Sequence, residues 1–279
     1  MVSLRGLTLT AARPRIIVPL FARDPAVLCP LAKAAGADPA AELVELRLDP
    51  LPADEFLNAL ALVRGIVDKP LVVTIRTQAE GGEAALTADQ YAAFCAAVCA
   101  SGCADLLDIE FFSAGERLPQ WIATAHAAGV KVVCSSHDFQ KTPPRAELVE
   151  RMVRMQQAGA DLPKLAVMPT CRTDVLELLA ATAEMADHHP ETPVITMSMG
   201  ALGAVSRLCG EVFGSAATFG MVGQGSAPGQ IPADQLCHDL CQPRHRQRPR
   251  SGAAGCCGHR AGQPAALLNR TQKIPAVSR

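Results

Sequence analysis

Residues 131–168, KVVCSSHDFQKTPPRAELVERMVRMQQAGADLPKLAVM, contain a complete strand–helix–strand unit. The two ends of this stretch, 131–137 and 162–168, are short and almost continuously apolar, as strands of a parallel sheet covered on both faces are expected to be. Between them, a pair of prolines precedes a helical pattern that ends at Gly159. The stretch therefore predicts two parallel strands joined by a helix.

The same alternation recurs along the chain, with strand starts roughly 25 to 35 residues apart. The apolar runs outside residues 131–168 are IIVPL at 16–20, LVELRLD at 43–49, LVVTIRT at 71–77, DLLDIEF at 105–111, PVITMSM at 193–199 and TFGMV at 218–222. Helical segments separate them, and one begins at Thr87, a residue type suited to cap a helix N-terminus. Eight such units predict an α/β fold, a (β/α)8 TIM barrel of eight parallel strands. An open doubly wound sheet would favour a Gly-rich phosphate turn after the first strand, and FARDPAV at 21–27 is not one.

The composition favours a large buried core and excludes several classes of protein. Of 279 residues, 49% are hydrophobic and 19% are charged, which is typical of a folded globular chain. The formal net charge of −1 gives no reason to expect a nucleic acid partner. No apolar run is long enough to cross a membrane, and the opening MVSLRGLTLTAARPR lacks the apolar stretch of a signal peptide. The eleven cysteines are odd in number and scattered through apolar segments, which indicates reduced thiols, so we expect a cytoplasmic protein.

The last part of the chain, residues 241–279, differs in composition from everything before it. It carries seven arginines, one lysine and no acidic residue, and it shows no apolar periodicity. Such a segment cannot offset its ordering entropy by burial. We therefore predict a barrel domain over 1–240 and a basic, poorly ordered tail over 241–279. The composition of the tail is closer to out-of-frame translation of a GC-rich gene than to a folded segment, and the alternative is a genuine basic appendage.

Polar side chains gather at the C-terminal ends of the predicted strands, where barrels of this kind build their active sites. Polar groups in apolar surroundings cost free energy unless they pair, so their convergence predicts a polar pocket. The residues at these ends are Glu45, Arg47, Asp49, Arg76, Glu80, Asp108, Glu110, His137, Asp138, Lys164, Met197 and Met199.

Lys164 is the most informative of these residues. It lies within the apolar strand LPKLAVM and is one of only six lysines in the chain. Burial disfavours the charged form of an amine, and a neutral amine is a nucleophile toward ketones and aldehydes. A lysine at a strand end can also extend to water, and its position alone does not separate these two interpretations.

His137, in the segment SSHDF, is the candidate general acid and base, because imidazole titrates near neutral pH. Glu80 could orient this imidazole, as the carboxylate of a hydrolase triad does. The alternatives are a core histidine bonded to a backbone carbonyl, and a solvent-exposed glutamate in the loop before Gly81 and Gly82.

No pattern in the sequence indicates a metal or nucleotide site. Cys95, Cys99 and Cys103 share a helix face, but no histidine accompanies them, and the packing of small apolar side chains explains the stripe. The Gly-rich segment GQGSAPGQ at 223–230 lacks the Lys-Ser/Thr of a P-loop, and we interpret it as a mobile lid. We therefore expect no bound metal.

A series of motifs, in this order along the chain, resembles the type I 3-dehydroquinate dehydratase family over roughly residues 14 to 235. Each motif alone is moderately specific, and the ordered set is strongly specific. The motifs are VELRLD, TIRTQAEGG, LDIEFF, SSHDFQKTP, DLPKLAVMP, MSMGALGAVSRLCGEVFGSAATFG and SAPGQ.

The resemblance implies a reaction: loss of water from 3-dehydroquinate to give 3-dehydroshikimate, a step of the shikimate route to aromatic amino acids. It implies an imine between Lys164 and the substrate ketone, with His137 moving protons and Glu80 paired with His137. The protonated imine is the electron sink, so neither a metal nor an organic cofactor is implied. Family members are often dimers, which implies a homodimer here.

The resemblance also implies a substrate site. Arg207 would bind the substrate carboxylate in the bidentate geometry that guanidinium favours. The other residues implied are Glu45, Arg47 and Arg76 at ring hydroxyls, Ser226 and Gln230 in the last loop, and Met197, Met199 and Phe219 as an apolar wall. Two other functions share part of this pattern: a class I aldolase with lysine-imine chemistry, and a non-catalytic ligand-sensing barrel of the same family. Turnover of 3-dehydroquinate separates the three.

We predict that a chain ending at Leu240 forms the imine as well as the full chain does and melts at the same temperature, because residues 241–279 have little large apolar surface to bury. Circular dichroism melts of the two chains test this prediction. A decrease of several degrees on truncation would show that the tail packs on the barrel.

Overall fold

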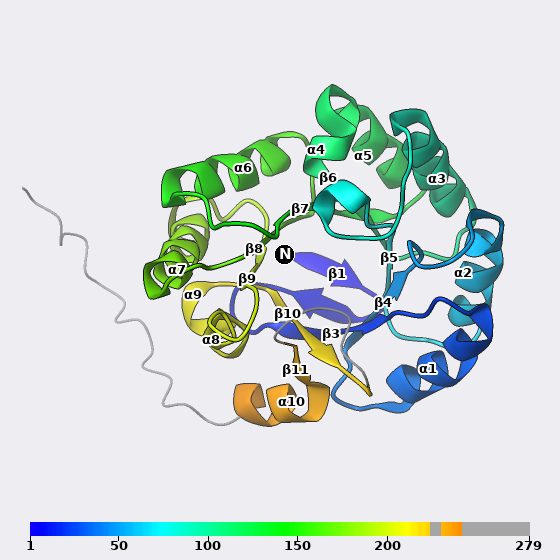
Figure 1. The fold of residues 1–279 in the computed structure, drawn as a ribbon, viewed down its shortest axis with the longest axis horizontal. Coiled ribbons are helices and arrows are strands. Elements are labelled where there is room, and N and C mark those ends of the chain that lie inside the picture. The colour runs from blue at the N-terminus through cyan, green and yellow to red at the C-terminus, as the bar shows by residue number, and fades with distance from the viewer. Residues whose placement is uncertain (224–229, 242–279) are drawn as a thin grey trace, which may run out of the picture. The chain divides into compact units, whose positions relative to one another are not determined.

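The computed structural model describes residues 1–223 and 230–241 and confirms the predicted barrel. Neighbouring strands pair in parallel and in chain order around the ring seen in Figure 1. The strands of the ring are β3 (Arg15–Leu20), β4 (Leu43–Arg47), β5 (Leu71–Thr74), β6 (Leu106–Glu110), β7 (Lys131–Asp138), β8 (Leu162–Val167), β9 (Ile195–Ser198) and β10 (Ala217–Met221). Each predicted apolar run contains one of them, with small shifts at the ends.

The ring closes between β9 and β10 by fewer hydrogen bonds than it has elsewhere. An isolated parallel bridge joins Val194 and Ser215, and the amide of Ala216 donates to the carbonyl of Val194 at 2.8 Å. A short ninth strand, β11 (Ile231–Pro232), pairs in parallel with the end of β10 on the side away from β3. The prediction of eight strands holds for the barrel itself, and β11 was not predicted.

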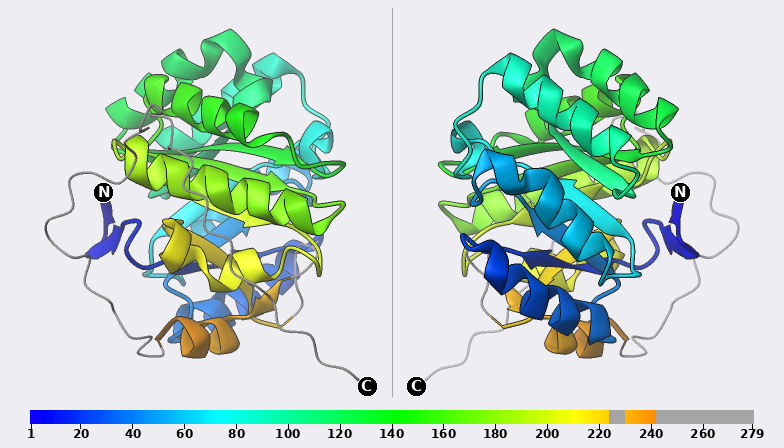
Figure 2. Two further views of the ribbon diagram at one scale, coloured as in Figure 1. Left: turned by 90° about the vertical axis from the view of Figure 1, so that its left-hand side faces the viewer. Right: turned by 90° about the vertical axis from the view of Figure 1, so that its right-hand side faces the viewer.

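Helices cover the outside of the barrel, as Figure 2 shows from two sides. At α3 the predicted cap is confirmed, since the amide of Gln90 donates to Thr87 Oγ1 and the amide of Thr87 donates to Gln90 Oε1. The longer helices are α1 (Pro25–Ala37), α2 (Phe56–Arg64), α3 (Ala88–Ala100), α5 (Leu118–Ala127), α6 (Arg145–Gln157), α7 (Arg172–His188) and α10 (Ala233–Cys241). The short helices are α4 (Phe111–Ala114), α8 (Val205–Leu208) and α9 (Gly210–Phe213), with 3-10 turns η1 (Ala53–Glu55), η2 (Gln78–Glu80) and η3 (Gly115–Arg117).

The side chains inside the barrel change from apolar to polar along the strands. Near the N-terminal ends they form one apolar cluster, to which each strand contributes: Ile17, Leu43, Val72, Leu106, Val133, Leu162, Ile195 and Ala217. Because side chains alternate between the two faces of a strand, residues two positions later also point inward. These next residues include Glu45, Thr74, Asp108, Ser135 and Lys164. The barrel therefore has an apolar floor beneath a polar upper interior.

An N-terminal hairpin covers the apolar floor. Strands β1 (Val2–Leu4) and β2 (Leu7–Leu9) pair antiparallel, and Val2, Leu4 and Leu9 are buried in the same cluster as the floor residues. Figure 2 shows the hairpin at one end of the barrel. Side chains at the other end, where the strands finish, are therefore the ones available to build a pocket.

Two predictions fall on other parts of the chain. The predicted tail lies outside the described residues beyond Cys241, and so does most of the predicted lid, residues 224–229. Within residues 1–223 and 230–241, no helix is both long enough and apolar enough to cross a bilayer. The cysteines from Cys29 to Cys237 are free thiols.

Candidate active site

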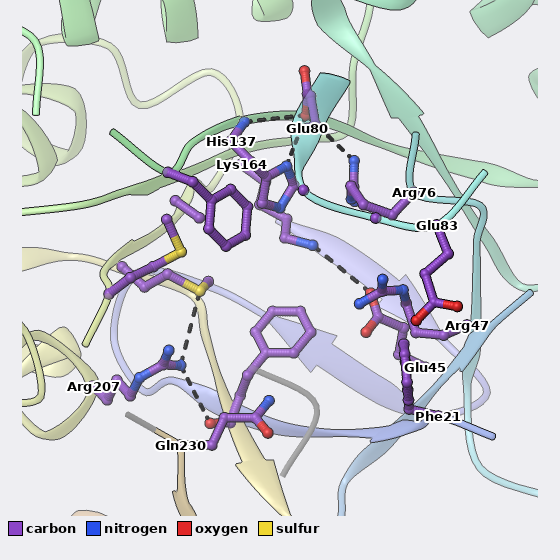
Figure 3. A pocket seen from close by; sticks show the side chains of 17 residues that line it. Phe21, Glu45, Arg47, Arg76, Glu80, Glu83, His137, Lys164, Arg207 and Gln230 are labelled. Atoms are coloured by element: carbon purple, nitrogen blue, oxygen red, sulfur yellow. Dashed lines mark hydrogen bonds and ion pairs between the residues drawn. The ribbon is translucent and has the colours of Figure 1, made fainter. Parts of the chain in front are cut away.

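One pocket at the C-terminal ends of the strands brings the predicted site residues together, as Figure 3 shows. Ser226 lies outside the described residues. The predicted residues that line the pocket are Glu45, Arg47, Arg76, Glu80, His137, Lys164, Met197, Met199, Arg207, Phe219 and Gln230.

Lys164 reaches the pocket from β8, with only 4% of its surface exposed. Its Nζ atom donates to Asp108 Oδ2 at 3.1 Å, lies 3.8 Å from Glu45 Oε1, and lies 4.6 Å from the centre of the Phe219 ring. The interpretation of this residue as a lysine that extends to water is therefore wrong. The sequence predicted apolar surroundings for this amine, and the structure agrees only in part, because two carboxylates face it.

His137 and Glu80 form a hydrogen-bonded pair (Figure 3). Nδ1 of His137 lies 2.8 Å from Glu80 Oε2, and the backbone amide of His137 donates to the same oxygen at 3.1 Å. With its proton on Nδ1, the imidazole keeps Nε2 as its basic nitrogen. Glu80 is 4% exposed, so the interpretation of Glu80 as a solvent-exposed loop residue is wrong.

The electrostatic environment favours the neutral forms of both partners. Burial raises the pKa of Glu80 to about 8, although the charge of Arg76 acts in the opposite direction. Burial also lowers the pKa of His137 well below its ordinary value of 6.5, and the charges of Arg76 and Lys164 add to this effect. Within the described residues Glu80 Oε1 has no hydrogen-bond partner, so only one of the two carboxyl oxygens is stabilised as a carboxylate. A neutral imidazole beside a protonated carboxyl is the expected state at neutral pH.

We predict that Glu80→Gln lowers kcat by less than ~10-fold, far less than loss of the imidazole, since general acid–base groups contribute ~10²–10⁴-fold. The reason is that below pH 8 glutamine has the same charge as the protonated carboxyl, and its amide oxygen can still accept the hydrogen bond from Nδ1–H. As the pH rises through about 8, Glu80 ionises, and its negative charge makes the His137 imidazole more basic. Glutamine does not ionise, so the variant should lack this change. Steady-state kinetics between pH 6 and pH 9 test this, and a loss as large as that of a histidine variant would contradict it.

The turn that holds Glu80 is tightly packed. Gly81 has a φ of +79°, which favours glycine, and a Cβ there would collide with the Phe139 ring. A Cβ at Gly82 would overlap the carbonyl group of Arg76. The two glycines therefore allow the turn to pack directly against the pocket.

Arg76 links the buried carboxylates behind the pocket. Its Nη1 atom donates to Glu110 Oε1 at 3.0 Å and to Ser135 Oγ at 2.9 Å, and it lies 3.4 Å from Glu80 Oε2. Its Nη2 atom lies 2.9 Å from Asp108 Oδ2. Burial alone would lower the pKa of Arg76, but the charges of these carboxylates outweigh burial and raise the pKa above its ordinary value. Arg76 is therefore a fixed cation that holds the acidic residues in place.

Two acidic residues of β4 and its following loop have different partners. Glu45 accepts from Thr74 Oγ1 at 2.9 Å, whereas Asp49 forms a two-fold ion pair with Arg47 at 2.7 and 2.8 Å. The Arg47 guanidinium also lies 5.3 Å from the centre of the Phe21 ring. Glu45 and Arg47 thus lie at the pocket with their side chains already oriented by neighbours.

Arg207 contributes a buried cation from α8, on the side of the apolar wall. It is 2% exposed, and burial lowers the pKa of its guanidinium to about 10. Its Nη1 atom donates to the Phe219 carbonyl at 3.5 Å.

Sequence reasoning did not assign several residues that line the pocket. Strand periodicity could have found two of them, because Ala166 is two positions after Lys164 and Phe139 is two positions after His137. The unassigned lining residues are Phe21, Gly81, Gly82, Glu83, Phe139 and Ala166.

The family comparison agrees with this geometry. A family model described as type I 3-dehydroquinase matches residues 16–241. The chain belongs to this family. It is 45% identical over 240 residues to the 3-dehydroquinate dehydratase of Bacillus licheniformis, covering 85% of this chain and 94% of that protein. It is 43% identical over 242 residues to the 3-dehydroquinate dehydratase of Salmonella agona, covering 84% of this chain and 95% of that protein.

Solved structures of the family share the fold. The type I 3-dehydroquinate dehydratase of Clostridium difficile, described with covalently modified comenic acid, superposes with a TM-score of 0.82 at 40% identity, covering 86% of this chain and 96% of that one. The 3-dehydroquinate dehydratase from Geobacillus kaustophilus superposes with a TM-score of 0.81 at 35% identity, covering 86% of this chain and 94% of that one.

Among the residues that the structure describes, no group of three or more His, Cys, Asp or Glu side chains is placed to hold a metal ion.

Proposed function

We propose that this chain dehydrates 3-dehydroquinate to 3-dehydroshikimate through an imine at Lys164. The observation that supports it best is a buried lysine, in a member of the type I 3-dehydroquinase family, that shares a pocket with a hydrogen-bonded histidine–glutamate pair. This family membership places the chain among hydro-lyases of the shikimate pathway.

Imine formation comes first in the proposed sequence. The Lys164 amine attacks the substrate ketone, a nitrogen–carbon bond forms, and the ketone oxygen leaves as water. Lys164 begins as an ammonium ion, and His137 takes one proton from it to free the attacking amine. A second proton passes from the nitrogen to the former ketone oxygen, and His137 returns its proton to the same oxygen, so water leaves and the imine nitrogen keeps one proton. The protonated imine then withdraws electrons from the adjacent carbon, so the proton on that carbon becomes more acidic.

Dehydration follows: the carbon next to the imine loses its proton, the following carbon loses its hydroxyl, and a carbon–carbon double bond forms between them. Nε2 of His137 removes the acidified proton, and the resulting imidazolium gives a proton to the departing hydroxyl. A water molecule then hydrolyses the imine and releases the product. The iminium supplies the electron sink, so the proposed chemistry needs neither a metal nor an organic cofactor.

The charges of the pocket suit a carboxylate-bearing substrate. A ligand carboxylate next to Arg207 would favour the charged guanidinium, whose pKa burial lowers. The other proposed substrate contacts are Glu45, Arg47 and Arg76 at ring hydroxyls, Ser226 and Gln230 from the last loop, and Met197, Met199 and Phe219 against the ring.

Two broader proposals concern the protein in the cell. We propose a cytoplasmic location, which the free thiols of the described residues support, and a homodimer, which the family resemblance supports. Light scattering coupled to size-exclusion chromatography tests the homodimer, and a monomer at micromolar concentration would contradict it.

Reductive trapping tests the proposed function directly. The full chain is incubated with 3-dehydroquinate, product absorbance is followed, and a parallel sample is reduced with borohydride and mapped by peptide mass spectrometry. We expect turnover and one adduct, on the peptide that contains Lys164. An adduct without turnover would favour an aldolase-like lyase, and binding without either would favour a ligand-sensing barrel.

A further inference from the structure

Asp108 is a buried carboxylate that touches the reacting nitrogen and has no role in the proposed steps. It lies on β6 with 0% of its surface exposed. Its Oδ2 atom accepts from Lys164 Nζ at 3.1 Å and lies 2.9 Å from Arg76 Nη2, and its Oδ1 atom accepts from Ser135 Oγ at 2.6 Å. These partners come from β8, from the residues just after β5, and from β7. The carboxylate is therefore held from three sides.

The carboxylates near Lys164 differ in charge and distance. Burial alone would raise the pKa of Asp108, but the charges of Arg76 and Lys164 and a hydrogen bond from Ser135 hold it below its ordinary value. Asp108 is therefore an anion at neutral pH, unlike Glu80, whose pKa is about 8. Glu45 lies farther from Nζ, at 3.8 Å, and the same oxygen already accepts from a threonine. Asp108 is the carboxylate best placed to balance charge on the lysine nitrogen.

We propose that Asp108 is a further catalytic residue, the fixed counter-ion of the Lys164 nitrogen in both its ammonium and its iminium form. The inference rests on the proposed imine. The overall change converts an ammonium ion and a ketone into an iminium ion and water, so the nitrogen carries one positive charge before and after. Asp108 therefore balances that charge without gaining or losing a proton, while His137 moves the protons.

The counter-ion has a specific consequence for the chemistry. Only the protonated imine is a strong electron sink, and a neighbouring anion keeps such a nitrogen protonated to higher pH. An anion that bound the iminium too strongly would slow the next step, since removal of the carbon proton neutralises the nitrogen. Arg76 and Ser135 share the charge of Asp108, which limits this effect.

We expect Asp108→Asn, which keeps the shape and removes the charge, to lower kcat by ~10²–10³-fold, the usual effect of losing one preorganised electrostatic partner. The alkaline limb of the kcat profile should move to lower pH by ~1 unit or more. Borohydride trapping of Lys164 should fall correspondingly more at pH 9 than at pH 6. The other charged or polar groups that face this nitrogen or its counter-ion remain in the variant: Glu45 from β4, Arg76, Ser135 and His137 from β7, and Arg207 from α8.

Glu110→Gln is the matched control. Glu110 lies on the same strand, is equally buried and pairs with Arg76 at 3.0 Å, but it has no contact with Lys164 in the described part of the chain. This variant should leave the alkaline limb in place. Equal losses of kcat in both variants, with neither limb displaced, would show that Asp108 is only structural and would overturn the proposal.

Two further measurements separate the other outcomes. If Asp108→Asn does not fold, Asp108→Glu keeps the charge and should keep the limb at its wild-type pH; a downward shift in this variant would overturn the proposal. If trapping of the wild-type protein marks another lysine, the proposed function itself fails. If trapping marks Lys164 but the alkaline limb of the kcat profile does not move in Asp108→Asn, the counter-ion role is rejected and the proposed function stands.

Discussion

Lys164→Ala is expected to abolish both turnover of 3-dehydroquinate and borohydride trapping, with a loss of at least ~10⁵-fold in kcat, the lower end of the advantage that covalent attachment in a fixed geometry gives. Without the imine, the proton on the substrate carbon is far less acidic, and the remaining pocket residues cannot supply an electron sink. The variant also leaves Asp108 and Glu45 beside an empty position, so its melting temperature must be measured alongside its activity.

Lys69→Ala is the matched control for Lys164. Lys69 is a partly buried lysine whose pKa is lowered by burial, and it lies just before the start of β5. Its Nζ atom donates to the backbone carbonyls of Ala35 and Asp38, away from the pocket residues. Turnover and trapping should survive this substitution. A folded Lys164→Ala variant that still gives a borohydride adduct on another lysine would remove Lys164 from its proposed role.

Most of the fold followed from local sequence signals, and the exceptions have physical causes. Near-continuous apolar runs predicted the ring strands, because a strand covered on both faces needs them. The hairpin Val2–Leu9 was missed because its turn is Arg5-Gly6, where Arg5 has a φ of +43° that arginine rarely adopts. Burial of Val2, Leu4 and Leu9 in the barrel floor stabilises this turn, and no local signal reports a long-range contact of that kind.

The site was predicted in its membership more than in its electrostatics. Strand ends and the family resemblance identified Lys164, His137 and Glu80, which the structure brings to one pocket. The pairing of Lys164 with Asp108 could not be read from spacing, because the two residues lie on strands separated by β7. The neutral state of the His137–Glu80 pair could not be predicted from the sequence either, because it depends on how far both side chains are buried.

His137→Ala is expected to lower kcat by ~10²–10⁴-fold, the range that a positioned general acid and base contributes. Imine formation should be slower without the proton transfers of His137 but should still occur, because the Lys164 nucleophile remains. The variant should therefore accumulate a trappable adduct while making little product. A single-turnover experiment with borohydride quenching separates the two steps, and near-normal kcat would show that His137 is only a structural histidine.

The pH profile gives an independent test of the same imidazole. Its pKa lies well below 6.5, so the neutral base persists as the pH falls through that value, and activity is lost only at lower pH. Wild-type kcat/KM should therefore be level from pH 7 to pH 6, whereas a base with an ordinary imidazole pKa would already be losing activity there. His126→Ala is the control, since His126 also pairs with a carboxylate, Asp161 at 2.7 Å, but lies before β7 at the opposite end of the barrel. Its profile should match that of the wild type, and a limb near 6.5 in both proteins would mean that His137 is exposed to water during turnover rather than buried.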